Sequence, residues 1–338
     1  MKKYGVLIVG TGWVSSEHIR AFEMNSHSRV VAIMSRSEER GKVRAIETGI
    51  PNAKVYTCYD RALEDSDVDI VCICTPNHLH TEQTIKAAEA GKHILIEKPI
   101  SLNWDDAKAM KAAVDKAGVK TLVGYVLRWN PLFETVKRMQ ERFIGNLYYA
   151  ETDYFHRVTE SYNCYDWTIK KEVGGSSLLA GGCHAVDAIR WFVQQDVEEV
   201  MAYSSTCRTD LEFDGTLVAL LKFKNGIMGK VGSSYDSISP YFFNLHLFGD
   251  KGTLLNNKLY SPREIERQKD YMVLPVETPD SGDVSHHPFP QEINHLIDCI
   301  LNDKCPIVDL DYAMKTQEVV FAADMSASTG KPVRLPLC

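Results

Sequence analysis

The chain has 338 residues, of which 44% are hydrophobic and 25% charged, a balance typical of folded globular proteins rather than disordered ones. Its formal net charge of −7 makes it a poor candidate for binding nucleic acid or an acidic membrane. At roughly 100–200 residues per domain, this length predicts two domains. Nine cysteines without a CxxC pair, and no apolar stretch close to the roughly 20 residues of a membrane span, favour a cytoplasmic protein with reduced thiols.

Short apolar runs alternate with helical patterns in the first 125 residues. We expect strands at 5–9, 29–34, 54–56, 68–74, 93–96 and 121–125. We expect helices at 16–24, 38–48 and 81–90, and a further helix capped by Asn103. Apolar strands separated by helices are typical of right-handed βαβ units and a parallel sheet. Residues 1–125 are therefore predicted to form an α/β, doubly wound dinucleotide-binding domain of the Rossmann type.

The pattern changes after residue 125. Helices are predicted at 131–141, 178–193, 289–301 and 312–329. Strands are predicted at 146–158, 200–207, 216–223, 227–234 and 243–248, with few helices between them, and Asn225-Gly226 signals a hairpin turn. Residues 126–338 are therefore predicted to form an α+β domain with an open, mostly antiparallel sheet that binds the substrate.

A glycine-rich turn follows the first predicted strand and opens a helix. It reads Gly10-Thr11-Gly12-Trp13-Val14-Ser15. Gly10 permits a tight turn, Gly12 lets the backbone approach a pyrophosphate, and Ser15 is small enough for helix–strand packing. The turn predicts a dinucleotide site, although a similar turn can hold no ligand.

The second strand ends at Ser35-Arg36, and Arg40 follows in the next helix. An acid at this place would bind the ribose hydroxyls of NAD, whereas a hydroxyl beside guanidinium groups suits a 2′-phosphate. The sequence therefore favours NADP(H), with NAD(H) still open. The alternative is that Arg36 and Arg40 form an ordinary solvated helix face.

Glu97-Lys98-Pro99 lies at the carboxyl end of a predicted parallel strand, the edge where doubly wound folds bind ligands. The proline restricts the backbone of Lys98 or permits a cis bond, and either would aim its ammonium reproducibly. Lys98 is therefore a candidate donor to a reacting oxygen. The alternative is a surface strand end without a catalytic role.

A second candidate is His184, preceded by Gly181-Gly182-Cys183 and followed by Asp187 on the same helical face. It could act as a general acid–base group or be an interhelical core histidine. His78, His80, His286 and His287 lack the matched ligand spacing of a zinc site, so no metal is expected. The loop residues Tyr162, Asn163, Tyr165, Asp166 and Trp167 could stack on a sugar or merely cover the core.

Together these motifs resemble the Gfo/Idh/MocA family, named from glucose–fructose oxidoreductase and inositol dehydrogenase. The resemblance spans nearly the whole chain, and Glu97-Lys98-Pro99 after the turn at 75–77 is its specific part. Its other motifs are residues 10–12, 75–80, 174–175, 184–187, 248–253 and 329–333.

The resemblance implies an oxidoreductase that transfers a hydride between a nicotinamide cofactor and a sugar, inositol or related polyol. It also implies homodimers or homotetramers packed through the sheet of the second domain. It assigns Lys98 and His184 as catalytic, with Pro99 cis. Tyr165, Trp167 and Asp187 are expected to bind substrate. The positions around the nicotinamide and its ribose are Thr75, Asn77, His80, Glu97, Lys98 and Arg128.

One departure from the family pattern is Ala180, because many members carry an aspartate four residues before the histidine. Asp187, Tyr165, Asp166 or a water could take its place. Two further functions therefore stay open: a glycoside-cleaving enzyme that uses transient oxidation and elimination, and a non-catalytic sensor of nucleotide and sugar.

Overall fold

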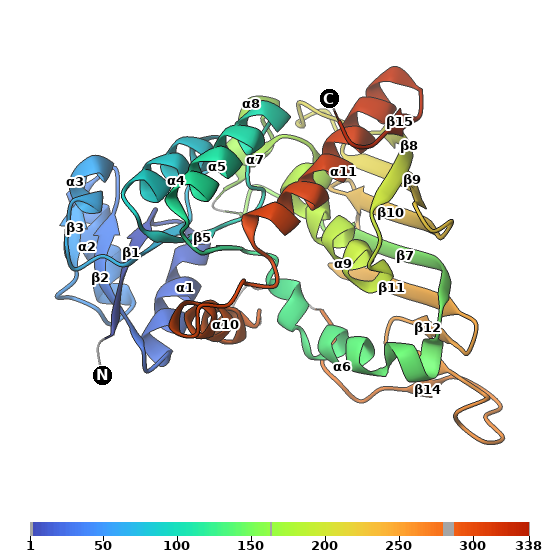
Figure 1. Cartoon of the computed structure of the whole chain (residues 1–338). Coiled ribbons are helices and arrows are strands. Elements are labelled where there is room, and N and C mark those ends of the chain that lie inside the picture. Colours follow the sequence, from blue (N-terminus) through green and yellow to red (C-terminus); the bar gives the residue numbers. More distant parts are fainter. Residues whose placement is uncertain (1–2, 163, 280–286, 338) are drawn as a thin grey trace. The chain divides into compact units, whose positions relative to one another are not determined.

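The computed structural model describes residues 3–162, 164–279 and 287–337 (Figure 1). The chain forms two compact units. The first contains the described residues up to Tyr125, together with 172–174 and 288–314. The second contains 126–171, the described part of 175–287, and the described residues from 315 onward. The first unit thus includes a C-terminal segment that the sequence analysis assigned to the second domain.

The sheet of the first unit has six parallel strands in the order β3-β2-β1-β4-β5-β6. This confirms the doubly wound fold, whose strand order reverses between β1 and β4 and opens a ligand crevice there. The strands are β1 (Tyr4–Val9), β2 (Ser28–Met34), β3 (Lys54–Tyr56), β4 (Ile70–Ile73), β5 (His93–Ile96) and β6 (Thr121–Val123).

Helices cover both faces of this sheet. In Figure 1, α4 and α5 lie on one side, and α1 and α10 lie on the other. Asn103 caps α5 by accepting a hydrogen bond from the backbone N–H of Asp106, as expected. The helices are α1 (Trp13–Met24), α2 (Glu38–Glu47), α3 (Tyr59–Leu63), α4 (His80–Glu89), α5 (Trp104–Ala117), α8 (Lys171–Gly174) and α10 (Phe289–Leu301).

The sheet of the second unit has nine strands in the order β14-β13-β12-β11-β7-β10-β9-β8-β15. Among the described strands of this sheet, β7 and β10 form the only parallel pair, and all other pairs are antiparallel. The predicted, mostly antiparallel character of the sheet is therefore confirmed. The strands are β7 (Leu147–Phe155), β8 (Val197–Ser205), β9 (Thr216–Phe223), β10 (Met228–Ser234), β11 (Phe242–Gly249), β12 (Thr253–Leu255), β13 (Lys258–Tyr260), β14 (Met272–Val273) and β15 (Val333–Arg334).

Burial alternates along β9, so one face of the nine-stranded sheet is buried and the other faces outward. The buried face carries α9, where Thr152 of β7 donates a hydrogen bond to the carbonyl of Ala185. The helices of this unit are α6 (Pro131–Met139), α7 (Tyr165–Thr168), α9 (Cys183–Val193) and most of α11 (Leu310–Thr329). The outward face exposes large apolar side chains, namely Tyr203, Leu220 and Met228.

The helix predicted over 178–193 is divided in the structure. A π-helical turn, η4 (Leu178–Gly182), precedes α9. Gly181 and Gly182 allow close packing, because a Cβ on Gly181 would lie 2.6 Å from the ring of Tyr154 and one on Gly182 would lie 2.5 Å from Ser233. The helix predicted over 131–141 likewise ends in a π-helical turn, η3 (Gln140–Ile144). No helix within the described residues has the length and apolar character needed to cross a bilayer.

Candidate active site

The glycine turn joins β1 to α1 at the carboxyl edge of the parallel sheet. Gly10 has φ +107°, and a Cβ there would lie 2.6 Å from the carbonyl oxygen of Cys74, so only glycine fits. A Cβ on Gly12 would approach no atom closer than 3.8 Å, which leaves space over this residue. Ser15 is buried and its hydroxyl donates to the carbonyl of Gly12. The start of α1 therefore presents main-chain N–H groups beside an open turn, as a phosphate site requires.

Ser35 and two arginines mark the end of β2. Ser35 is buried, and its hydroxyl accepts a long hydrogen bond, 3.4 Å, from the backbone N–H of Ser37. Arg36 and Arg40 are exposed, and neither guanidinium forms an ion pair with any described residue. Arg44, which sequence reasoning missed, donates from Nη2 to the carbonyl of Thr11 at 3.1 Å and so ties α2 to the glycine turn.

His80 links the loops that follow β4 and β5. Its Nδ1 lies 2.8 Å from the carbonyl oxygen of Pro99, and its Nε2 lies 2.9 Å from that of Thr75. Burial lowers the pKa of His80, against the opposing effect of these hydrogen bonds. Both ring nitrogens are thus used within the protein. The side chain of Thr75 bonds to Gln83, and the buried amide of Asn77 donates to the carbonyl of Gly174 at 3.4 Å.

His18 of α1 anchors the Glu97-Lys98-Pro99 turn. Nε2 of His18 lies 2.7 Å from Oε1 of Glu97, and the backbone N–H of Lys98 donates to Oε2 at 3.2 Å. Burial raises the pKa of Glu97, but the hydrogen bond from His18 and nearby positive charges outweigh it and hold the pKa below its usual value. Glu97 is therefore ionised. Lys98 is half-buried, and its bond to Pro99 is cis, as the resemblance implied.

Gly124 completes the pocket that holds this carboxylate. A Cβ on Gly124 would lie 3.1 Å from the carboxyl atoms of Glu97. Any larger residue there would crowd Glu97, so the glycine after β6 keeps the carboxylate beside His18.

His184 lies in the second unit, near the start of α9. It is buried, and its ring stacks on that of Tyr154 with centroids 6.1 Å apart and an angle of 26°. Ala180 belongs to an apolar cluster with Val158 and Tyr235. A packed apolar residue, Ala180, therefore occupies the position at which many family members carry an aspartate.

Arg128 and Asp187 form a buried bidentate ion pair. Nε and Nη2 of Arg128 donate to the two oxygens of Asp187 at 2.7 and 2.8 Å, and the guanidinium lies 5.2 Å from the ring centre of Trp191. Burial lowers the pKa of the neighbouring Lys137 to about 8, and the charge of Arg128 adds to this effect. The two buried charges therefore satisfy each other.

The aromatic loop predicted to bind sugar is partly engaged within the protein. Tyr165 donates a hydrogen bond to Asp210, which also pairs with Arg208. Trp167 is half-buried and Asp166 is exposed, whereas Asn163 lies outside the described residues. Sequence reasoning missed His156, which hydrogen-bonds to Tyr162 and whose ring stacks on Tyr154.

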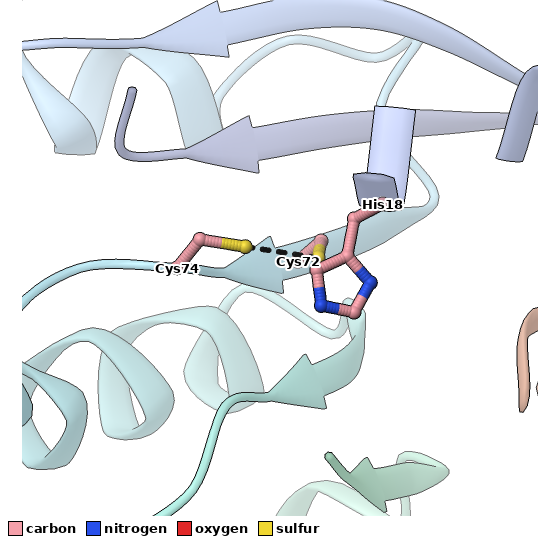
Figure 2. A group of neighbouring side chains, drawn as sticks. All are labelled: His18, Cys72 and Cys74. Atoms are coloured by element: carbon pink, nitrogen blue, oxygen red, sulfur yellow. Dashed lines mark hydrogen bonds between the residues drawn. The ribbon is translucent and has the colours of Figure 1, made fainter. Parts of the chain in front are cut away.

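One group of side chains within the described residues has a spacing compatible with a metal ion. It consists of His18, Cys72 and Cys74, all buried, with one ligand atom from each lying within 4.8 Å of the others (Figure 2). Figure 2 shows the sulfurs of Cys72 and Cys74 facing each other, and they lie 3.5 Å apart. Burial raises the pKa of both thiols, which favours neutral thiols over metal-binding thiolates. His286, considered above for metal binding, lies outside the described residues.

Comparisons with known proteins agree with this architecture. Residues 4–125 match the oxidoreductase family with an NAD-binding Rossmann fold, GFO_IDH_MocA, and residues 133–255 match the GFO/IDH/MocA C-terminal domain. The chain therefore belongs to the Gfo/Idh/MocA oxidoreductase family, and the resemblance drawn from its motifs is confirmed.

Individual relatives are similar over nearly their full length. D-xylose 1-dehydrogenase (NADP(+)) 2 of Haloferax volcanii is 27% identical over 97% of this chain and 98% of that protein. The WlbA dehydrogenase of Bordetella pertussis, solved with NADH and UDP-GlcNAcA, has a TM-score of 0.83 and 27% identity over 100% of both chains. The aldose-aldose oxidoreductase of Caulobacter crescentus, solved with glycerol, has a TM-score of 0.82 and 28% identity over 99% of this chain and 100% of that one.

The Arg128–Asp187 pair gives a prediction about stability. Replacing Arg128 by methionine should lower the free energy of unfolding by about 3–5 kcal/mol, because Asp187 would stay buried without its partner. Urea unfolding followed by circular dichroism measures this loss. The double variant Arg128→Met with Asp187→Leu should recover most of it, and a double variant as unstable as the single one would contradict the argument.

Proposed function

We propose that this protein is an NADP(H)-dependent dehydrogenase or reductase that acts on a CH–OH group of a sugar, inositol or related polyol. The observation that carries the proposal is the placement of Lys98. It follows β5, at the same edge of the parallel sheet as the glycine turn after β1. That edge is where doubly wound folds bind nucleotides. The named activities of the relatives support the substrate class.

The residues of the first unit fit a nicotinamide dinucleotide. The glycine turn, with Trp13 and Val14 opening α1, would hold the pyrophosphate at the helix N-terminus. Thr75, Asn77 and the Glu97-Lys98 turn lie after neighbouring strands, where the nicotinamide and its ribose would bind. His80 supports these loops through its two main-chain hydrogen bonds. When bound, the nicotinamide supplies hydride acceptance or donation.

Two side chains would handle the oxygen and the proton of the substrate. Lys98 would donate a hydrogen bond to the reacting oxygen and stabilise the negative charge that develops on it. His184 would accept or return the hydroxyl proton. Tyr165 and Trp167 would contact the substrate from the loop, and Asp187 would act through Arg128.

We further propose a cytoplasmic protein that assembles as a homodimer or homotetramer. The eight cysteines within the described residues are all free thiols, as in a reducing compartment. The outward face of the nine-stranded sheet carries Tyr203, Leu220 and Met228, which are 68%, 60% and 61% exposed. Large exposed apolar side chains on one sheet face are typical of an interface between copies of a chain.

The choice of cofactor is tested at Arg36. Calorimetric titration of cofactor-free protein should show tighter binding of NADP(H) than of NAD(H). Arg36→Ala should weaken NADP(H) binding about tenfold or more, since a charge-assisted bond to phosphate contributes roughly 1.5–3 kcal/mol, and should leave NAD(H) binding unchanged. Arg29→Ala, at the other end of β2, is the matched control. Tighter binding of NAD(H) by the unmodified protein would refute the selectivity, and binding of neither would refute the function.

The role of Lys98 is tested by Lys98→Met, which keeps most of the side-chain volume. Turnover of polyols with NADP(H) should fall by about two orders of magnitude or more, because the charge that stabilises the reacting oxygen is lost. Nucleotide binding should persist. Unchanged turnover would refute the mechanism. Cleavage of a glycoside by protein that retains its nucleotide, without net redox turnover, would favour the elimination chemistry instead.

The assembly is tested at Leu220, an exposed residue of β9 on the outward sheet face. Leu220→Lys should convert the oligomer to a monomer, because a lysine buried in the interface would lose its hydration. Light scattering after size exclusion measures the mass. Ile46→Lys, at an exposed apolar position of α2 in the first unit, should leave the mass unchanged. A monomeric unmodified protein would refute this proposal.

A further inference from the structure

Glu292 is a fully buried acid in the middle of an apolar helix face. The buried residues of α10 include Phe289, Glu292, Ile293 and Leu296, which recur at the spacing of one helix face. Glu292 is 0% exposed, and neither of its carboxyl oxygens has a hydrogen-bond partner among the described residues. An unpaired carboxylate is very costly in such a place, so the neutral acid is the stable form. Burial raises the pKa of Glu292 well above its usual value, and the charge of Glu97 raises it further.

The groups that act on Glu292 come from several elements of the first unit. Phe289, one turn before Glu292, makes an edge contact with the ring of His18, with centroids 4.8 Å apart, which places α10 against α1. Glu292 interacts electrostatically with Glu97 after β5 and with the two thiols of β4. The titratable groups around this cluster are Glu97, His18, Cys72, Cys74, His80 and Lys98.

The negative charge of this cluster lies on Glu97. Glu97 accepts hydrogen bonds from His18 and from the backbone N–H of Lys98, whereas Glu292 accepts none from the described residues. When two carboxyl groups interact in this way, one is ionised and the other stays protonated, because ionisation of one disfavours ionisation of the other. His18 therefore decides which of the two is charged.

We propose that Glu292 is a positioning residue for the reaction: with Glu97 it forms a buried carboxyl pair that holds one proton and one negative charge beside the Lys98 turn. The pair acts through Glu97, whose charge interacts with that of Lys98. If Glu292 were ionised as well, a second negative charge would favour the positively charged, oxidised nicotinamide. Its proton therefore limits the charge at this half of the site. The catalytic consequence rests on the proposed function, whereas the carboxyl pair itself does not.

The pair is tested first without any ligand, through Glu292→Gln, which keeps the shape but cannot ionise. An acid with a raised folded-state pKa destabilises the fold increasingly as pH rises above its unfolded value. The unfolding constant of the unmodified protein should therefore rise relative to that of Glu292→Gln by up to about tenfold per pH unit as pH rises above about 5. Glu89→Gln, an exposed position of α4, should show no such trend.

An infrared spectrum at neutral pH supplies the second measurement. The unmodified protein should show the C=O stretching band of a protonated carboxylic acid, and Glu292→Gln should lack it. Glu292→Met, which needs no polar partner, is the second variant if the glutamine variant does not fold. A pH-independent stability difference together with an unchanged band would overturn the carboxyl pair. Stoichiometric zinc that is lost in Cys72→Ser would also overturn it, because a cation would then neutralise both carboxylates.

The link to the reaction is tested with NADP+ and NADPH. The ratio of their affinities should shift toward NADP+ as pH rises through the alkaline range in the unmodified protein, and should shift less in Glu292→Gln. Equal pH dependence in both proteins would overturn the positioning role. Failure of both proteins to bind either nucleotide would refute the proposed function, while the stability and infrared measurements would still decide the carboxyl pair.

Discussion

The hydrogen bond between His18 and Glu97 is the contact on which the first half of the site depends. α1 begins at the glycine turn and carries His18 about one and a half turns later, while Glu97 directly precedes Lys98. One helix therefore holds both the turn that would receive the pyrophosphate and the turn that carries Lys98. Because the bond is buried and charge-assisted, it contributes roughly 1.5–3 kcal/mol and limits relative movement of the two turns.

His80 makes the same kind of connection at the next pair of loops. Its two ring nitrogens approach the main-chain carbonyls of Thr75 and Pro99, so the ends of β4 and β5 are joined by one buried side chain. Both histidines hold loops together, His80 through both ring nitrogens and His18 through Nε2. Joining the two loops in this way limits their movement, and under the proposed mechanism Lys98 would be a preorganised donor to the reacting oxygen.

The sequence predicted the fold well because its signals are local. Apolar strands bounded by glycine, a capping Asn103 and the hairpin at Asn225-Gly226 depend on near neighbours only. The position of α10 in the first unit was not predictable in this way, because it follows from contacts such as Phe289 with His18, far apart in the chain. The motif Glu97-Lys98-Pro99 is likewise local and could be recognised in the sequence. Its anchor His18 could not, because it lies 79 residues before Glu97. Glu292 gave one signal, an acid within an apolar helical stripe, which a periodicity analysis of 289–297 could have found.

Ala180 leaves no carboxylate four residues before His184, where many family members carry an aspartate. Asp187 is committed to Arg128 through two hydrogen bonds, and Tyr165 donates to Asp210, so two of the groups expected to replace the missing aspartate already have partners. His184 instead stacks on Tyr154, an aromatic contact that orients the ring but carries no charge. In the first unit, by contrast, Glu97, Glu292 and His18 gather ionisable groups beside Lys98. Two buried acids, Glu97 and Glu292, thus lie in the unit that carries Lys98, whereas the buried acid on the helix of His184, Asp187, is neutralised by Arg128.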